Sequence, residues 1–225
     1  KNIKIVGLVT RKNGNFWWRQ EELINFAKQN NIKIIKKKSL KNLKADLLIS
    51  VLYPFILNKE ILMNSKLSIN LHQGPLPELK GKYSNYHCII NNMKYFGSTL
   101  HLMNSKLDGG EIIEKKLFKI SESDTAIELY KKNDQVAFDI FKRNINKIIN
   151  FKFKTFKQIK SNKSKTFNIN SIKNEVKNIK DKKKLWNFVR ANEFPPFSPA
   201  YIKYKSKKIY LITNPNIHFN KIKKK

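Results

Sequence analysis

Short apolar runs that alternate with helix-like segments constrain this chain more than any other feature of its sequence. Asp46–Leu52 is apolar at almost every position, as in a strand covered on both faces of a parallel sheet, and Leu67–Leu71 repeats the pattern. Thr125–Asn150 carries apolar residues at helical spacing behind Ser123 or Asp124 as a cap. This alternation predicts an α/β fold with a mostly parallel, Rossmann-like sheet.

The same patterns predict shorter elements around these three. Further strands are expected at Ile3–Val9, Ile32–Ile35, Gly97–Met103 and Glu111–Ile120, and further helices at Glu21–Asn30 and Ser84–Asn91.

The composition changes after the long helix. Phe151–Ile172 is rich in lysine, serine and asparagine and is interpreted as a linker. A helix over Asn174–Ala191 and a hairpin of Ala200–Tyr204 and Lys208–Thr213 are expected beyond it. The sequence therefore predicts a first domain over residues 1–150, followed by a linker and a small C-terminal β-containing module over residues 151–225.

The composition also excludes several classes of protein. Cys88 is the single cysteine, which rules out an internal disulfide framework, a multi-cysteine zinc site and an iron–sulfur cluster. The four histidines lack metal-ligand spacing, so no metal is expected. The longest apolar run, Leu47–Leu57, is far short of the roughly 20 residues of a membrane span. No leader pattern opens the chain, which favours a cytoplasmic location and no membrane partner.

The net charge of +31 has two explanations. A basic surface attracts phosphate groups, so an anionic substrate or partner such as a nucleotide or tRNA fits the charge. However, only four of the 47 basic residues are arginines, and the lysines are dispersed along the chain among asparagines and isoleucines. Compositional drift on solvated faces would give the same pattern, and it is the explanation we favour.

The most informative stretch runs from Leu67 to Gly81. Asn70 and His72 stand two residues apart near the C-terminal end of a predicted strand, so their side chains share one face. Ligands bind at that end of the strands in open α/β sheets. The segment that follows contains two glycines and two prolines, which suit a site that is built before its substrate arrives.

A carboxylate, Asp108, stands in a later turn before Gly109 and Gly110. An amide, an imidazole and a carboxylate that converge on one cleft can catalyse acyl transfer, because the first two donate hydrogen bonds to a developing oxyanion and the third orients the imidazole or relays protons. No Ser, Cys or Thr has the setting of a nucleophile elbow, which favours direct attack by the substrate's own amine. Taken singly, His72 is also explained as a structural histidine and Asp108 as a turn former. The remaining histidines are expected to be structural or exposed: His87, His101 and His218.

Three spaced motifs resemble those of the folate-dependent formyltransferases. They are N-x-H-x(2)-P-L-P-x(3)-G from Asn70 to Gly81, G-x-T-x-H from Gly97 to His101, and L-D-x-G-x-I-I from Leu107 to Ile113. The motifs occur in the family's order, and the resemblance covers residues 3 to 210. The family includes glycinamide ribonucleotide formyltransferase, methionyl-tRNA formyltransferase and the nucleotide-sugar N-formyltransferases.

The resemblance implies a catalytic trio and a formyl donor. The family's trio falls on Asn70, His72 and Asp108, and its donor is 10-formyltetrahydrofolate, whose formyl carbon an acceptor amine attacks. Asn70 and protonated His72 would stabilise the oxyanion, while Asp108 would orient His72 and help to move the amine proton. The resemblance also implies a pterin pocket between two segments, with Tyr53, Phe55, Ile56 and Leu57 on one side and Met103 and Leu107 on the other.

The two ends of the chain shape the remaining expectations. The family fold begins with a strand and a glycine-containing loop, whereas this chain opens on Ile3–Val9, so the N-terminal strand is expected to be missing. Leu185–Tyr201 resembles the start of the C-terminal module of tRNA and sugar formyltransferases. The loop Thr10–Gln20 and the stretch after Tyr201 are shorter than their counterparts in the tRNA enzymes. These shorter segments favour a small amine acceptor, and a nucleotide-linked amino sugar fits best.

Other interpretations stay open at this point. A methionyl-tRNA formyltransferase has the net charge in its favour. An inactive relative could keep the trio and bind folate without turnover. A lysine-rich nucleic-acid binder without folate is a further alternative, and a homodimer is also left open.

Overall fold

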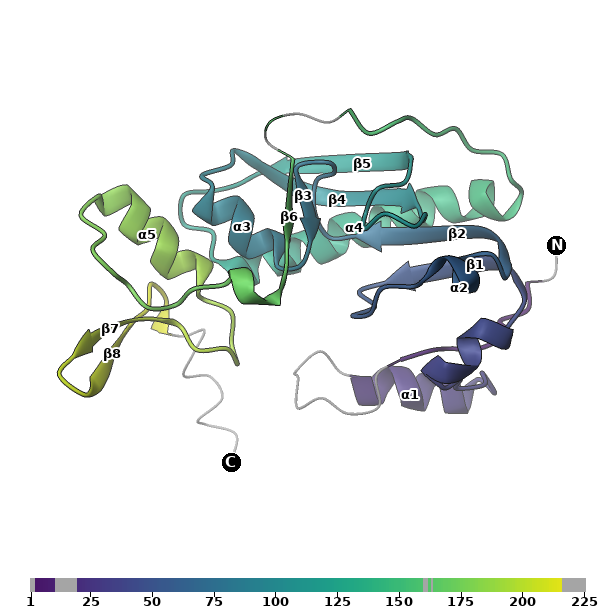
Figure 1. The fold of residues 1–225 in the computed structure, drawn as a ribbon, viewed down its shortest axis with the longest axis horizontal. Helices are drawn as coiled ribbons and strands as arrows, with labels where there is room; N and C mark the ends of the chain where they lie inside the picture. Colours follow the sequence, from purple (N-terminus) through teal and green to yellow (C-terminus); the bar gives the residue numbers. More distant parts are fainter. Residues whose placement is uncertain (1–2, 11–19, 160–161, 163, 216–225) are drawn as a thin grey trace.

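The computed structural model describes residues 3–10, 20–159, 162 and 164–215. Its centre is a four-stranded sheet with the order β1-β2-β4-β5 (Figure 1). These strands are β1 (Ala45–Val51), β2 (Ser65–His72), β4 (Tyr95–Leu102) and β5 (Ile112–Lys119). β1 and β2 run parallel, while β4 and β5 extend the sheet in antiparallel orientation. The predicted α/β class is confirmed.

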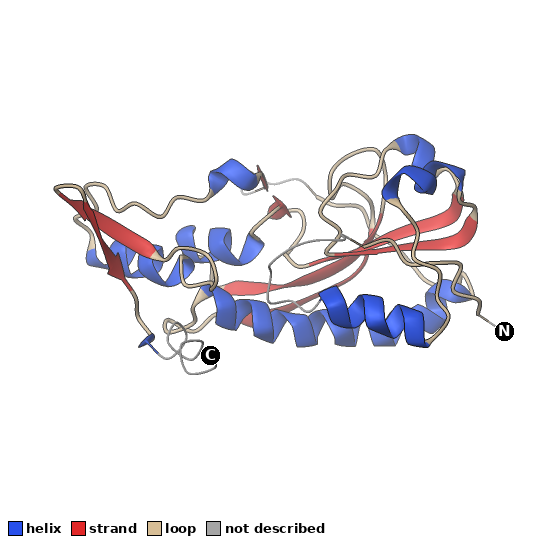
Figure 2. Cartoon of the chain, turned by 90° about the horizontal axis from the view of Figure 1, so that it is seen from below, coloured by secondary structure: helices blue, strands red, loops and turns tan. Residues whose placement is uncertain are grey.

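The long helix α4 (Ala126–Ile149) covers one face of this sheet (Figure 2). Ile140 and Ile148 of the helix are fully buried, and they form one core cluster with Ile69, Leu71 and Leu100 of the sheet. Each buried aliphatic side chain of this kind contributes roughly 1.5–3 kcal/mol by leaving water. The face of β2 that carries these residues is therefore fixed against the helix.

Thr125 caps α4, although the sequence favoured Ser123 or Asp124. The Thr125 hydroxyl oxygen accepts from the Glu128 amide, and the Glu128 carboxylate accepts from the Thr125 amide at 2.8 Å. This is a capping box, which satisfies two amides that a helix start leaves unpaired. Asp124 cannot serve as the cap because its carboxylate already binds the Ser121 amide and the Lys132 ammonium.

A second core cluster joins the sheet to the C-terminal part of the chain. It lies between α3 (Ser84–Ile90), α5 (Lys182–Ala191) and the short strand β3 (Leu79–Gly81). Leu79, Tyr86, Ile89, Phe96 and Ala191 are all buried in it. The helix predicted at Ser84–Asn91 is therefore present, and one of its faces packs on α5.

The predicted linker does not pass directly from one unit to the other. Phe156 forms an antiparallel bridge with Ile112, and β6 (Lys165–Phe167) pairs in parallel with β3. The 3₁₀ turn η2 (Ile169–Ser171) follows. The segment thus returns along the first domain, and the boundary at residue 150 stays a prediction.

The C-terminal helix is shorter than expected. The prediction was Asn174–Ala191, but α5 begins at Lys182, with the Asp181 carboxylate accepting from the Lys184 amide at 2.8 Å. Residues 174–176 are extended instead, because the backbone of Asn174 and Val176 bonds to Tyr201. The expected hairpin is present as β7 (Ala200–Tyr204) and β8 (Lys207–Leu211).

Two buried charged residues tie this C-terminal part to the start of α4. The Arg190 guanidinium donates to the Asp124 carbonyl at 2.6 Å and to the Asn187 side chain at 2.9 Å. Glu193 is fully buried, and its backbone carbonyl accepts from the Ile127 amide at 3.1 Å. Its carboxylate accepts from the amide and the hydroxyl of Thr213.

The N-terminal part contains three short helical elements. They are α1 (Gln20–Gln29), the 3₁₀ helix η1 (Lys37–Asn42) and α2 (Lys59–Leu62). The strands predicted at Ile3–Val9 and Ile32–Ile35 are reduced to one parallel bridge between Leu8 and Ile34, because Ile3 and Ile5 stay exposed instead of entering a covered sheet. The missing N-terminal strand stays a prediction. His218 and most of the loop Thr10–Gln20 lie outside the described residues.

Within the described ranges, no helix combines the length and the apolar character needed to cross a membrane.

Ile140→Ala should lower the free energy of unfolding by about 2–5 kcal/mol, because it empties part of the cluster between α4 and the sheet. Phe138 lies on the same helix, two residues away, but is 58% exposed. Phe138→Ala is therefore a matched control with an expected change of less than about 1 kcal/mol. Urea unfolding followed by circular dichroism measures both, and equal losses would contradict this packing.

Candidate active site

Neighbouring strands bring the polar side chains of the site together. Asn70 and His72 lie two residues apart on β2 and share a face, as the alternation of a strand predicts. The antiparallel register of β2 and β4 sets His101 opposite Asn70. Asp108 lies in the loop between β4 and β5 and reaches back to this cluster. The predicted trio therefore meets in one place, together with a second histidine.

His72 is buried, and both of its ring nitrogens face defined groups. Nε2 lies 2.7 Å from the Leu79 carbonyl oxygen. Because a carbonyl can only accept, Nε2 carries a hydrogen. Nδ1 lies 3.7 Å from Asp108 Oδ2, which is ion-pair range but longer than a hydrogen bond. Nδ1 is therefore the ring nitrogen that faces the Asp108 carboxylate.

Asp108 directs its carboxylate into the cluster rather than into its own turn. Oδ2 accepts from the Gly81 amide at 2.7 Å, and Oδ1 accepts from the Asn70 amide nitrogen at 3.4 Å. The side chain is 8% exposed, and the backbone φ of 44° lies in the left-handed region. A left-handed non-glycine residue costs free energy. A left-handed aspartate also suits a turn, so the place of Asp108 in the cluster rests on the contacts of its carboxylate.

His101 was expected to be structural or exposed, and the structure places it in the site. It is 2% exposed. Its Nδ1 lies 2.7 Å from the Leu102 carbonyl oxygen, to which it donates, and its Nε2 lies 3.1 Å from the Asn70 amide nitrogen. Burial is the main cause that lowers the pKa of His101 to about 4; the hydrogen bond to Leu102 and the charge of Asp108 oppose it, and the charges of His72 and Lys80 act with it. His101 is therefore neutral at pH 7, with its Nε2 lone pair turned to Asn70.

The Asn70 amide has its orientation fixed by two acceptors. Nδ2 faces the lone pair of His101 and the carboxylate of Asp108. Exchanging nitrogen and oxygen would set an oxygen against two acceptors, so the nitrogen must point inward. The contact to His101 is the shorter of the two. The hydrogen directed at Asp108 is the one that a ligand oxygen could take over.

The loop after β2 forms a compact wall beside His72. The Thr99 hydroxyl donates to the Gly74 carbonyl at 2.8 Å and accepts from the Leu76 amide at 3.1 Å. A Cβ on Gly74 would lie 2.7 Å from His72 Nε2, so no larger residue fits there without movement of the imidazole. The rigidity expected from the prolines and glycines is thus supported by Thr99 of β4.

The residues predicted to hold a pterin lie on two segments on opposite sides of β2. Those between Tyr53 and Leu57 follow the carboxyl end of β1. On the other side of β2, the Met103 amide donates a hydrogen bond to the Ser68 carbonyl. Phe55 and Ile56 are exposed, Leu57 is buried, and Tyr53 contacts Phe55 with ring centroids 5.6 Å apart. Their role stays a prediction.

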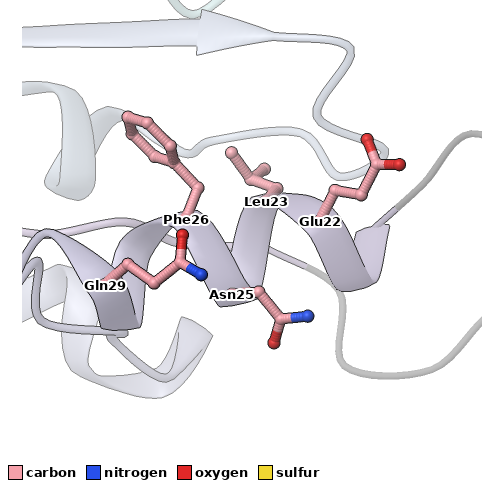
Figure 3. Close-up of a pocket in the computed structure, with 5 residues that line it drawn as sticks. All are labelled: Glu22, Leu23, Asn25, Phe26 and Gln29. Atoms are coloured by element: carbon pink, nitrogen blue, oxygen red, sulfur yellow. The ribbon is translucent and has the colours of Figure 1, made fainter.

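The other features that could bind a ligand lie elsewhere. A hollow of about 580 Å³ is lined by Glu22, Leu23, Asn25, Phe26 and Gln29, all on α1, and Figure 3 shows Leu23 and Phe26 on the same side of that helix. None of these residues belongs to the polar cluster. His87 is buried, stacks on Phe167 with centroids 3.6 Å apart and contacts the Ser171 hydroxyl at 2.8 Å. Among the described side chains, no group of three His, Cys, Asp or Glu is arranged to hold a metal ion.

Comparison with known sequences points to one family. The family model described as Formyl transferase matches residues 5–145. Methionyl-tRNA formyltransferase of Malacoplasma penetrans (strain HF-2) is 26% identical over 201 residues, which covers 89% of this chain and 63% of that protein. A methionyl-tRNA formyltransferase of Mycoplasma capricolum is 28% identical, with 84% of this chain and 64% of that protein covered. The chain thus spans less than two thirds of the length of these relatives.

Solved structures give a matching result. The N-formyltransferase of Helicobacter canadensis, in complex with folinic acid and dTDP-3-aminofucose, has a TM-score of 0.72 and 30% identity, covering 83% of this chain and 69% of that one. WlaRD, a sugar 3N-formyl transferase with dTDP and 5-N-formyl-THF, has a TM-score of 0.72 and 32% identity, covering 83% and 68%. A 4-N formyltransferase of Francisella tularensis shares the fold, with a TM-score of 0.77 at 23% identity and coverage of 88% and 84%.

The neutrality of His101 predicts a pH-dependent contribution to stability. Its ordinary pKa is 6.5 and its pKa in the fold is about 4, so the unfolded chain takes up the proton first as the pH falls. The fold therefore loses stability between pH 6.5 and 4, and His101→Gln should remove that loss. Urea unfolding of both proteins at pH 7.5, 6 and 4.5 measures the difference in unfolding free energy between wild type and variant, which should shrink as the pH falls.

His87, whose burial also lowers its pKa to about 4, is present in both proteins and cancels in this difference. A difference that stays constant from pH 7.5 to 4.5 would contradict a neutral His101.

Proposed function

Because this chain belongs to the formyl transferase family, we propose that it transfers a formyl group from 10-formyltetrahydrofolate to a primary amine. The acceptor that we propose is the amine of a nucleotide-linked amino sugar. The observation that carries the proposal is the buried contact of Asp108 with Asn70 and His72. An amide donor, an imidazole and a carboxylate are the groups that acyl transfer to an amine requires. The protein is further proposed to act in the cytoplasm.

Each side chain of the cluster has a defined task in this reaction. Asn70 Nδ2 makes its longer hydrogen bond to Asp108. In the reaction it donates this hydrogen to the formyl oxygen instead, where negative charge develops as the amine attacks. His72 stabilises the same charge when Nδ1 is protonated, since Nε2 is already committed to the Leu79 carbonyl. Asp108 accepts the proton that the amine must lose when its new bond to carbon forms, and the proton returns to the nitrogen from which the formyl group departs.

His101 acts through Asn70. Its neutral Nε2 accepts one hydrogen of the Asn70 amide and so aims the other toward the reacting oxygen. A protonated His101 would instead oppose the Asn70 nitrogen with a second donor. The low pKa of His101 therefore keeps the amide in its useful orientation across the neutral pH range.

The segment from Tyr53 to Leu57 fits a folate donor, which supplies the formyl group when bound. Phe55 and Ile56 are 43% and 74% exposed, so their apolar surface is open to a ligand. The Tyr53 hydroxyl is buried without a hydrogen-bond partner among the described residues. Apolar side chains that cover an aromatic ring and a free polar group for its edge are what a pterin would use.

The choice of a sugar acceptor rests on similarity to solved structures. Of the two structural relatives at 30% and 32% identity, one is bound to dTDP-3-aminofucose and the other is a sugar 3N-formyl transferase, and this chain covers more than two thirds of each. The net charge of +31 favours the second candidate, methionyl-tRNA.

A direct assay separates these possibilities. The full chain is incubated with radiolabelled 10-formyltetrahydrofolate and either dTDP-linked amino sugars or methionyl-tRNA. Transfer to the amino sugar supports the proposal, and transfer to methionyl-tRNA alone replaces the acceptor. Folate binding without transfer to either acceptor would identify an inactive relative and overturn the proposal.

His72→Ala and Asp108→Asn should each lower kcat by about 100-fold or more, as expected for loss of an oxyanion donor or of the group that orients it. Asp139→Asn is the control, because Asp139 lies on the outer side of α4 and contacts Gln135 and Lys116. The labelled-formyl assay measures all three, with circular dichroism to confirm folding. Near-normal turnover in either site variant would remove the trio from the chemistry.

Ile56→Asp should weaken folate binding about tenfold, because it sets a charge on the surface proposed for the pterin ring. Met63→Asp is a matched control, since both side chains are 74% exposed and Met63 follows α2. Fluorescence titration with tetrahydrofolate gives the two dissociation constants. Equal constants for both variants would place the donor elsewhere.

A further inference from the structure

The position of the Asp108 carboxylate depends on the backbone of its loop. Asp108 has a φ of 44°, and the Gly109 amide bonds to the Lys106 carbonyl at 3.1 Å. A Cβ on Gly110 would lie 1.8 Å from the Leu102 carbonyl oxygen, so the loop passes against the end of β4 without any space. The side chain has only two rotatable bonds beyond this backbone. A shift of the loop therefore moves the carboxylate directly.

One distant side chain holds this loop from the other side. Gln158 donates from Nε2 to the Asp108 carbonyl at 2.8 Å and to the Gly110 carbonyl at 2.7 Å. Both acceptors are carbonyl oxygens, which can only accept, so the Gln158 nitrogen must face them. Both hydrogens of a single amide are thus spent on the two carbonyl groups that flank Gly109.

Gln158 is itself fixed by the segment that returns from α4. Phe156 and Ile112 exchange two backbone hydrogen bonds, of 2.8 and 2.9 Å, and the Thr155 hydroxyl donates to the Glu111 carboxylate. These contacts align residues 155–158 along the end of the Asp108 loop. The amide of Gln158 is therefore delivered by a rigid backbone pairing rather than by a free surface segment.

The arrangement has a cost that argues against an incidental contact. Gln158 Oε1 is buried and has no hydrogen-bond partner among the described residues. An unpaired buried polar atom costs about 1–3 kcal/mol. The fold tolerates this cost while both Nε2 contacts to the loop are kept.

We propose that Gln158 is a positioning residue for the proposed transfer reaction. By holding the carbonyl groups of Asp108 and Gly110, Gln158 fixes the position of the Asp108 carboxylate. The inference rests on the proposed function for its kinetic consequence, but not for the clamp itself. Gln158 touches neither the amide of Asn70 nor the imidazole of His72 through these bonds. Its effect on the chemistry passes through Asp108.

A double-mutant cycle tests the kinetic consequence. Gln158→Ala should lower kcat about tenfold or more with KM values within about twofold, because the loop still forms but places the carboxylate poorly. In an Asp108→Asn background the same change should have no further effect, since the group through which it acts is already lost. Gln135→Ala is the matched control, because Gln135 is an exposed glutamine on α4 that bonds to Asp139.

A second measurement follows the carboxylate without any substrate. The Gly81 amide donates to Asp108 Oδ2 at 2.7 Å, so its hydrogen exchange reports where the carboxylate lies. Gln158→Ala should accelerate exchange at Gly81 toward the rate of Asp108→Ala, while Gln135→Ala leaves it unchanged. Gln158→Glu keeps the shape of the side chain but replaces the donor nitrogen with an oxygen. If the alanine variant does not fold, the same exchange measurement is made on Gln158→Glu, with the same expected acceleration.

The outcomes are distinct. An equal loss of kcat in both backgrounds, or a kcat within twofold of the parent, overturns the positioning role. Unchanged exchange at Gly81 overturns the clamp. If the parent chain transfers no formyl group, the proposed function fails while the exchange experiment still decides whether Gln158 holds Asp108.

Discussion

The buried carboxylate of Asp108 is the group on which the rest of the site depends. Removing a carboxylate from water costs several kcal/mol, and a hydrogen bond to a charged group returns about 1.5–3 kcal/mol. Asp108 has one strong bond, from the Gly81 amide, and one long bond, from Asn70, with two histidine nitrogens at 3.7 Å. The fold thus holds a carboxylate that is only partly satisfied. Such a group keeps hydrogen-bonding capacity for a bound ligand.

The sequence predicted part of the site because part of it is local. Asn70 and His72 share a face through the alternation of a single strand, which one sequence is enough to show. Asp108 followed from motif order, since its left-handed conformation and its approach to Gly81 leave no periodic signal. The place of His101 beside Asn70 depends on the register of β2 and β4, which the sequence alone does not give. Gln158 lies 50 residues beyond Asp108 in a lysine-rich stretch without periodicity, so no pattern could indicate it.

The fold was predicted best where the hydrophobic pattern is long. The helix predicted at Thr125–Asn150 is one residue from α4 at each end, because its apolar face covers the sheet over many turns. The helix before the hairpin was predicted eight residues too long. There, backbone bonds of Asn174 and Val176 to Tyr201 overrule the local preference for a helix. The short strands β3 and β6 were not predicted, since three residues carry no measurable alternation.

The contacts of Arg190 and Glu193 have a consequence for recombining relatives of this chain. The Arg190 guanidinium donates to the Asp124 carbonyl, and the Glu193 carbonyl accepts from the Ile127 amide, so both links use backbone groups of the turn before α4. A foreign C-terminal segment grafted after residue 150 would have to place a guanidinium and a carbonyl group against this turn, whose own side of each link is main chain. In evolution, the constraint should consequently fall on the C-terminal stretch rather than on the turn, although a whole helix separates the two along the chain.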